Sequence, residues 1–201
     1  MKVRLGVLIS GGGSNLQAIL DTTKTPILDC AEVVTVISNK KEALGLQKAK
    51  QAHVSALLIE LKNFSSRFDY YEEIIRVLKE KKVDLICLAG FLLRLEPNII
   101  HQFQGCILNI HPSLLPRHGG IGMYGHHVHE AVIKSHDLES GCTVHVVDEE
   151  LDHGPILMQR KIPVLPTDTP ETLAARVLKE EHLLYPAAIS EFIKNNFSSR
   201  I

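Results

Sequence analysis

Asn109 and His111 are the two side chains whose types and spacing point most directly to chemistry. They lie in the stretch Leu108 to Pro116, which begins like a β-strand and leaves it at a proline. Residues two apart on a strand face the same side, so the amide and the imidazole are presented together. This pair suits a carbonyl that becomes a tetrahedral oxyanion. Standing alone, they would more simply be core residues satisfied by backbone hydrogen bonds.

A third candidate, Asp152, lies in the acidic turn from Asp148 to Pro155. It directly precedes His153-Gly154-Pro155, where the chain is constrained. A fixed carboxylate beside His111 would favour the charged form of that imidazole. Most charge runs are solvated loops, and this reading suffices for the other acidic residues of the turn. From the residues alone, the proximity of Asp152 to His111 is a hypothesis.

The glycine-rich stretch Ser10-Gly11-Gly12-Gly13-Ser14-Asn15 is a candidate phosphate site. Glycine lets the backbone approach a ligand closely, and the free amides at the start of a following helix favour an anion. The stretch lacks the Lys-Ser/Thr ending of a P-loop and the spacing of a dinucleotide fingerprint, so a monophosphate fits better than a triphosphate. A merely tight strand-to-helix turn explains it equally well.

The elements that must position these residues alternate between strands and helices in the first half of the chain, which is typical of repeated βαβ units. Apolar runs predict strands over Val3–Ile9, Glu32–Ile37, Val54–Ile59, Asp84–Leu88 and Cys106–Ile110. Helical spacing covers Asn15–Leu20, Ala43–Ala52 and Phe68–Lys81. We therefore expect an α/β fold, with a single domain over residues 1–201 and a Rossmann-like, open, mostly parallel sheet that has helices on both faces.

The pattern changes after Pro112, where prolines and glycines predict a long loop, more often functional than idle. A helix over Val128–His136, a strand over Gly141–Val147 and an extended segment over Pro155–Val164 follow. The last element is a helix. Thr169 caps it, Pro170 suits its first turn, and apolar residues recur on one face until Pro186 disturbs the hydrogen bonding.

Composition limits the classes of partner. The 22 basic and 23 acidic residues nearly cancel, so we expect no general affinity for nucleic acid or for a membrane surface. The longest apolar run, Leu85 to Leu93, is too short to span a bilayer, and the start of the chain has no signal-peptide pattern, so we expect a cytoplasmic protein.

The four cysteines lack paired spacing and indicate buried free thiols.

Taken together and in this order, the motifs resemble the folate-dependent formyltransferase family, and the resemblance extends over nearly the whole chain. The matching pieces are Leu8 to Ile19, Leu88-Ala89-Gly90-Phe91, Asn109 to Pro116, and Glu149-Glu150-Leu151-Asp152-x-Gly154-Pro155. The Asn-x-His-Pro-Ser element marks the wider family, and the Ser-Gly-Gly-Gly-Ser-Asn element points to its purine-synthesis branch.

The resemblance implies an enzyme of one-carbon metabolism that moves the formyl group of 10-formyltetrahydrofolate to the primary amine of N1-(5-phosphoribosyl)glycinamide, also called glycinamide ribonucleotide. The catalytic set would be Asn109, His111 and Asp152. The substrate phosphate would bind at Gly13, Ser14 and Asn15. Glu181 would reach the ribose hydroxyls, although a solvated helix carboxylate is the plain alternative for that residue.

The same resemblance implies a folate site formed by Arg67, Asn109 and the segment Leu92-Leu93-Arg94-Leu95. The family usually has Met-Arg-Ile-Leu in this segment, so the arginine is displaced by one position here, and whether Arg67 or Arg94 meets the folate glutamate stays open. His126, His127 and His129 lie where family members vary. We expect a flexible loop with incidental histidines and no metal, because no partnering ligand set is evident.

Several alternatives stay open. A hydrolase that deformylates the same folate usually carries an additional amino-terminal domain, and a methionyl-tRNA formyltransferase usually carries a carboxyl-terminal domain. A formyltransferase acting on a sugar nucleotide and a nonenzymatic nucleotide-binding module are also compatible with the motifs. We expect small-molecule substrates, and a monomer or weak homodimer.

Overall fold

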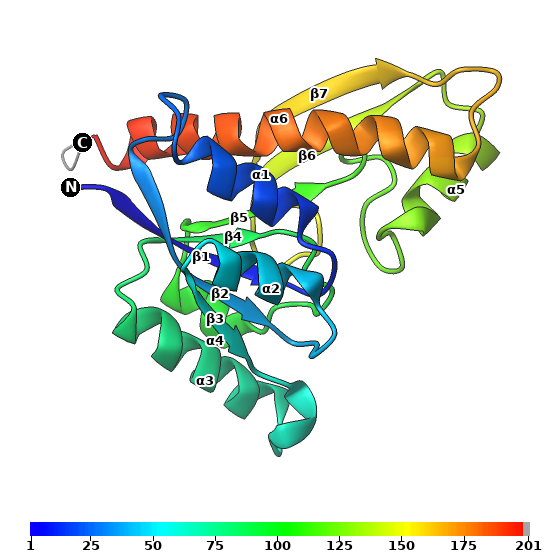
Figure 1. Cartoon of the computed structure of the whole chain (residues 1–201). Helices are drawn as coiled ribbons and strands as arrows, with labels where there is room; N and C mark the ends of the chain where they lie inside the picture. Colours follow the sequence, from blue (N-terminus) through cyan, green and yellow to red (C-terminus); the bar gives the residue numbers. More distant parts are fainter. Residues whose placement is uncertain (199–201) are drawn as a thin grey trace.

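The computed structural model describes residues 1–198, which form one seven-stranded sheet with the order β3-β2-β1-β4-β5-β6-β7 (Figure 1). The strands are β1 (Val3–Ile9), β2 (Ala31–Ser38), β3 (Ser55–Leu58), β4 (Leu85–Leu88), β5 (Ile107–His111), β6 (Glu139–Val146) and β7 (Ile156–Pro163). All pairings among β1 to β5 are parallel, whereas β5–β6 and β6–β7 are antiparallel. The predicted open, mostly parallel sheet is confirmed.

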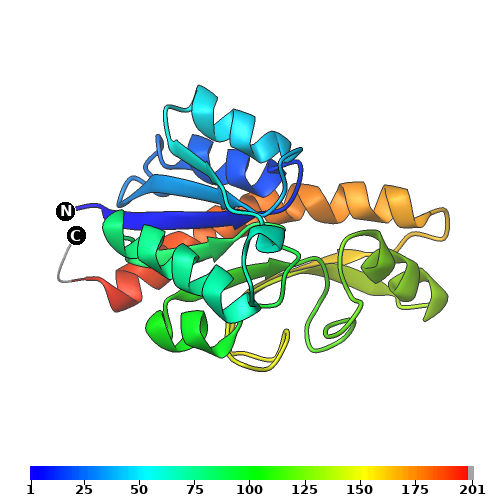
Figure 2. The ribbon, with the colours of Figure 1, turned by 90° about the horizontal axis from the view of Figure 1, so that it is seen from below.

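Helices cover both faces of the sheet, as predicted. One core cluster joins α1 (Ser14–Thr22), α2 (Leu44–Gln51), α5 (His126–Lys134) and α6 (Pro170–Asn196) to the sheet, and the other joins α3 (Arg67–Glu80) and α4 (Pro97–Gln102) to the opposite face. The alternation of β1 explains the division, since Val7 lies in the first cluster and Leu8 in the second. Figure 2 shows α3 and α4 on the side of β1 away from α6.

The terminal helix is longer than its sequence predicts. It begins with a capping box between Thr169 and Thr172 and continues through Pro186 to its end. Buried residues lie on both sides of the proline, and the Tyr185 hydroxyl donates to the Leu88 and Leu108 carbonyls at 3.0 and 2.9 Å. Packing against β4 and β5 therefore outweighs the backbone hydrogen bond that proline removes.

Two further differences concern short helices. The six-residue α4 is not predicted, because so few residues carry no usable periodicity. The expected flexible loop around His126 and His127 is wrong, since both residues belong to the first turn of α5. The long loop itself is present over residues 112–125. No helix within residues 1–198 has the length and apolar character needed to cross a membrane.

Candidate active site

His111 and Asp152 lie together beyond the carboxyl end of β5, although 40 positions of chain separate them. His111 is the last residue of β5, and Asp152 lies in the turn between β6 and β7. Their nearest atoms, Nδ1 and Oδ1, are 3.6 Å apart, and the side chains are only 4% and 8% exposed. In such surroundings opposite charges attract more strongly than in water. The structure therefore brings the carboxylate to the imidazole, as the sequence hypothesis requires.

The Asp152 carboxylate is held by backbone from a distant loop. Asp152 has a positive φ of 56°, and its Oδ2 accepts a hydrogen bond from the Gly120 amide at 2.9 Å. A Cβ on the neighbouring Gly119 would lie 2.6 Å from Leu115 Cδ2 and 3.2 Å from Asp152 Cβ. The absence of a side chain at Gly119 thus lets the 112–125 loop close over the carboxylate.

The orientation of the His111 ring is set by a hydrogen bond from Nε2, the ring nitrogen that does not face Asp152. Nε2 lies 2.8 Å from the His118 carbonyl oxygen, which can only accept, so Nε2 carries a hydrogen. The His118 ring is in turn 2.7 Å from Asp137 Oδ2, just beyond the end of α5. Nδ1 is thereby left facing Asp152.

Asn109 is oriented by a residue that the sequence does not single out, His145. The two are paired in the β5–β6 register, and Asn109 Nδ2 lies 3.1 Å from His145 Nε2. Burial lowers the pKa of His145, an effect that nearby Asp152 opposes, and its Nδ1 hydrogen points to the Val146 carbonyl at 3.2 Å. Nε2 of the neutral ring therefore accepts from Asn109, which leaves the second amide hydrogen of Asn109 for a ligand. In the sequence, His145 could have been recognised as a candidate because it is a polar residue within an otherwise mostly apolar strand.

A third buried histidine, His129, comes from α5. Burial, then the neighbouring His126 and His111, lower its pKa to about 4. His126 and His127 instead face acidic residues: His126 lies 3.2 Å from Glu130 and 3.4 Å from Glu171. Among residues 1–198, no cluster of three or more His, Cys, Asp or Glu has the arrangement of a metal site.

The glycine-rich loop forms a tight turn at the carboxyl end of β1. Gly13 precedes α1 with φ 67° and ψ 38°, and no side chain caps the helix start. The first amides of α1 therefore point outward with the positive end of the helix dipole. Gly45 of α2 packs against the turn, and a Cβ on Gly13 would lie 2.6 Å from Gly45 Cα.

We expect Gly13→Ala to lower the free energy of unfolding by about 1–3 kcal/mol, because alanine is strained at positive φ and its methyl group meets the α2 backbone. Denaturant titration measures the change. Gly12→Ala is the matched control, since a Cβ there meets nothing within 4 Å. Equal stability of the two variants would contradict the tight contact.

Glu181 of α6 reaches the same end of α1. It is 7% exposed, and its Oε2 accepts from Asn15 Nδ2 at 2.6 Å. The alternative of a solvated carboxylate is therefore wrong. Burial raises the pKa of Glu181, and the hydrogen bond from Asn15 partly opposes this. The structure thus joins two of the predicted substrate-binding residues.

The raised pKa of Glu181 predicts a pH-dependent stability. Because the folded state favours the protonated acid, folding is most favourable below the ordinary pKa of 4.5 and weakens as the pH rises towards the raised native value. Glu181→Gln has no proton to lose, so we expect its unfolding free energy to decline less over this window. Denaturant titrations from pH 4 upward test this, with Glu180→Gln as the control. Parallel curves for wild type and Glu181→Gln would contradict it.

Arg67 and Arg94, the two candidate folate residues, are linked to each other. Arg67 Nε pairs with Glu96 at 2.5 Å, and its guanidinium also donates to the Arg94 carbonyl. The Arg94 side chain donates to the Glu149 carbonyl at 3.0 Å, in the turn that carries Asp152. Arg67 thus pairs with a carboxylate, whereas within residues 1–198 the Arg94 side chain donates to a neutral carbonyl oxygen and joins the expected folate segment to the turn that carries Asp152.

The rest of that segment offers an apolar surface. Leu92 is 50% exposed and Leu95 is buried, while Leu93 is half-buried between them. The Leu92 amide is fixed by Ser10 Oγ at 2.9 Å, so this wall adjoins the glycine-rich loop. An exposed leucine beside polar groups suits one face of a flat heteroaromatic ring whose edge carries hydrogen-bonding groups, as the expected folate site requires.

Comparison with known proteins agrees with this architecture. The family model described as "Formyl transferase" matches residues 3–189. Phosphoribosylglycinamide formyltransferase of Escherichia coli is 42% identical over 92% of this chain and 85% of its own length. The trifunctional purine biosynthetic protein adenosine-3 of Drosophila melanogaster is 46% identical, and the match spans 94% of this chain but only 14% of that protein.

A solved structure is equally similar. The crystal structure of phosphoribosylglycinamide formyltransferase from Brucella melitensis superposes with a TM-score of 0.88 and 44% identity, covering 96% of both chains. Glycinamide ribonucleotide transformylase 1 from Symbiobacterium toebii gives a TM-score of 0.89 at 40% identity, covering 96% of this chain and 89% of that one. With these matches and the convergence of Asn109, His111 and Asp152, the chain belongs to the formyl transferase family.

Proposed function

We propose that this enzyme transfers the formyl group of 10-formyltetrahydrofolate to the primary amine of N1-(5-phosphoribosyl)glycinamide, in purine synthesis. The proposal is supported by an alignment that covers 85% of a bacterial phosphoribosylglycinamide formyltransferase, together with a buried His111 that lies 3.6 Å from Asp152 and two residues after Asn109 on the same strand. We further propose that residues 1–201 act as a single cytoplasmic domain, as a monomer or weak homodimer, on small molecules alone.

In this proposal Asn109 and His111 stabilise the formyl oxygen while the substrate amine adds to the formyl carbon. The second amide hydrogen of Asn109 would donate to charge that develops on this oxygen only during the reaction, and the Nδ1 side of a protonated His111, which the His118 carbonyl does not hold, would do the same. His111 then donates its proton to the departing folate nitrogen. The Asp152 carboxylate stabilises the charged ring, takes through a water the proton that the attacking amine loses, and returns it to His111.

The remaining assignments concern binding. Gly13, Ser14 and Asn15 would hold the phosphate, since outward-pointing amides at the start of α1 favour an anion. Glu181, joined to Asn15, would accept hydrogen bonds from the ribose hydroxyls. The apolar segment from Leu92 to Leu95 would line the pterin. We assign the folate glutamate to Arg94 rather than Arg67, because the Arg67 guanidinium already pairs with Glu96.

An assay of the purified chain with glycinamide ribonucleotide and 10-formyltetrahydrofolate tests the function by following release of tetrahydrofolate. We expect release to depend on the ribonucleotide and to match the formylated product in amount. Release without the ribonucleotide would indicate a deformylating hydrolase, and nucleotide binding without turnover would indicate a binding module. Either result would overturn the proposal.

A further inference from the structure

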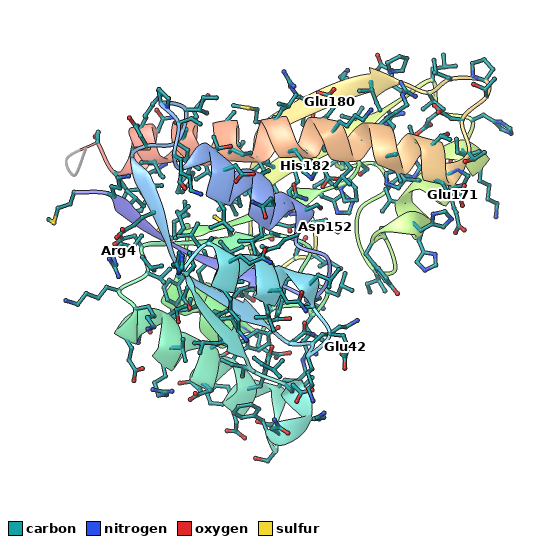
Figure 3. All side chains as sticks on the ribbon, viewed as in Figure 1. Arg4, Glu42, Asp152, Glu171, Glu180 and His182 are labelled. Carbon is teal, nitrogen blue, oxygen red and sulfur yellow. The ribbon has the colours of Figure 1, made fainter. Side chains whose placement is uncertain are left out.

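One short segment, residues 118–120, holds both His111 and Asp152. The His118 carbonyl accepts a hydrogen bond from His111 Nε2 at 2.8 Å, and the Gly120 amide donates to Asp152 Oδ2 at 2.9 Å. Asp152 lies near the carboxyl ends of the parallel strands (Figure 3). The position of this segment therefore decides how the imidazole and the carboxylate lie relative to each other.

The backbone of this segment is strained where it meets His111. His118 has a φ of 54°, which a residue with a Cβ rarely adopts and keeps only when its surroundings hold it there. Ser113 Oγ donates to the Arg117 carbonyl at 2.7 Å and lies 3.4 Å from the His118 carbonyl oxygen. These bonds stay within the loop, so fixing the segment relative to the sheet requires an anchor from another element.

Asp137, just beyond the end of α5, supplies such an anchor. Its Oδ2 lies 2.7 Å from His118 Nε2, and the two side chains are only 16% and 14% exposed. The way in which the helix ends fixes the carboxylate, since His136 adopts a φ of 52° and the Asp137 amide donates back to the Val132 carbonyl at 3.3 Å. A rigid helix end thus holds the His118 ring in place.

We propose that Asp137 and His118 form a positioning pair for the reaction. The Asp137 carboxylate holds the His118 ring, and the ring fixes the backbone carbonyl that orients His111. The inference rests on the proposed function and adds to it two residues that act only through others. Arg117 also reaches Asp137, at 3.5 Å, but its side chain is 53% exposed, and exposed ion pairs contribute little.

Steady-state kinetics of His118→Asn and Asp137→Ala, alone and combined, test the proposal. Asparagine tolerates the positive φ but has no ring to reach Asp137. We expect each single variant to lower kcat by about tenfold while KM for both substrates changes much less, because misplaced catalytic groups weaken the transition state more than binding. The double variant should be no slower than the slower single variant, since both substitutions break one contact.

Two control variants test whether the contact itself matters. Asp137→Asn keeps an oxygen that can accept from the His118 ring, so it should retain most of the turnover that Asp137→Ala loses. Arg117→Gln removes the exposed partner of Asp137 and should behave as wild type. Equal losses in Arg117→Gln and Asp137→Ala, or a double variant whose loss is the product of the two single losses, would overturn the proposal.

Nitrogen NMR of the His111 ring separates this inference from the proposed function, because it requires no turnover. At a pH where the ring is neutral, the hydrogen should reside on Nε2 in wild type, since the His118 carbonyl accepts it. His118→Asn and Asp137→Ala should show a mixture of the two tautomers. If wild type lacks formyl transfer but the variants show this mixture, the proposed function fails and the positioning pair stands. If the tautomer is the same in all three proteins, the positioning pair fails.

Discussion

His111→Ala should lower turnover by about a hundredfold or more while leaving the fold intact. In the native protein the ring lies 3.6 Å from Asp152 and is fixed through Nε2 to the His118 carbonyl, so it is placed to stabilise charge and to deliver a proton. Alanine removes both abilities, and water in the resulting space has no fixed orientation. The rate of formyl transfer at saturating substrate measures the loss.

The matched control is His53→Asn. His53 is exposed, lies before β3 at the opposite edge of the sheet, and has a positive φ that asparagine tolerates. We expect this variant to turn over like wild type. A His111→Ala protein that folds normally and keeps full turnover would remove His111 from the mechanism.

Asp152→Asn should lower turnover by roughly tenfold to a hundredfold. Asparagine fits the positive φ of 56° and its side-chain oxygen can still accept from the Gly120 amide, so the turn should keep its shape. The substitution chiefly removes the negative charge 3.6 Å from the buried His111 ring, so a positive charge that develops on the ring loses its nearest counter-ion. Single-turnover kinetics would assign the loss to the chemical step.

Asp148→Asn serves as the control for the acidic turn. Its side chain is 41% exposed and accepts from the Glu150 amide within the same turn. We expect little change in turnover there. If both substitutions had the same small effect, the turn would contribute only general negative charge and Asp152 would lose its special role.

The sequence predicted the parts of the site that depend on local pattern. The alternation in β5 placed Asn109 and His111 on one side of a strand, and the glycines after β1 predicted a tight turn before α1. Both follow from short-range geometry, because a strand repeats every two residues and a glycine-rich turn is defined by its own residues.

The parts that depend on distant pairing could not be predicted from pattern. The position of Asp152 requires the antiparallel β6 and β7 to fold back beside β5, and the role of His145 requires the register that sets it opposite Asn109. Such registers are decided by the whole core. The continuation of α6 past Pro186 is a similar case, because Tyr185 binds strands far away in the chain.

The hydrogen bond from the Gly120 amide to Asp152 joins the 112–125 loop to the turn between β6 and β7, which are far apart along the chain. Separation of the loop from the turn breaks this bond and leaves the carboxylate without its backbone donor. Hydrogen exchange at the Gly120 amide therefore reports how often the carboxylate is released. Protection of this single amide measures the fraction of molecules in which the 112–125 loop is bonded to the Asp152 carboxylate.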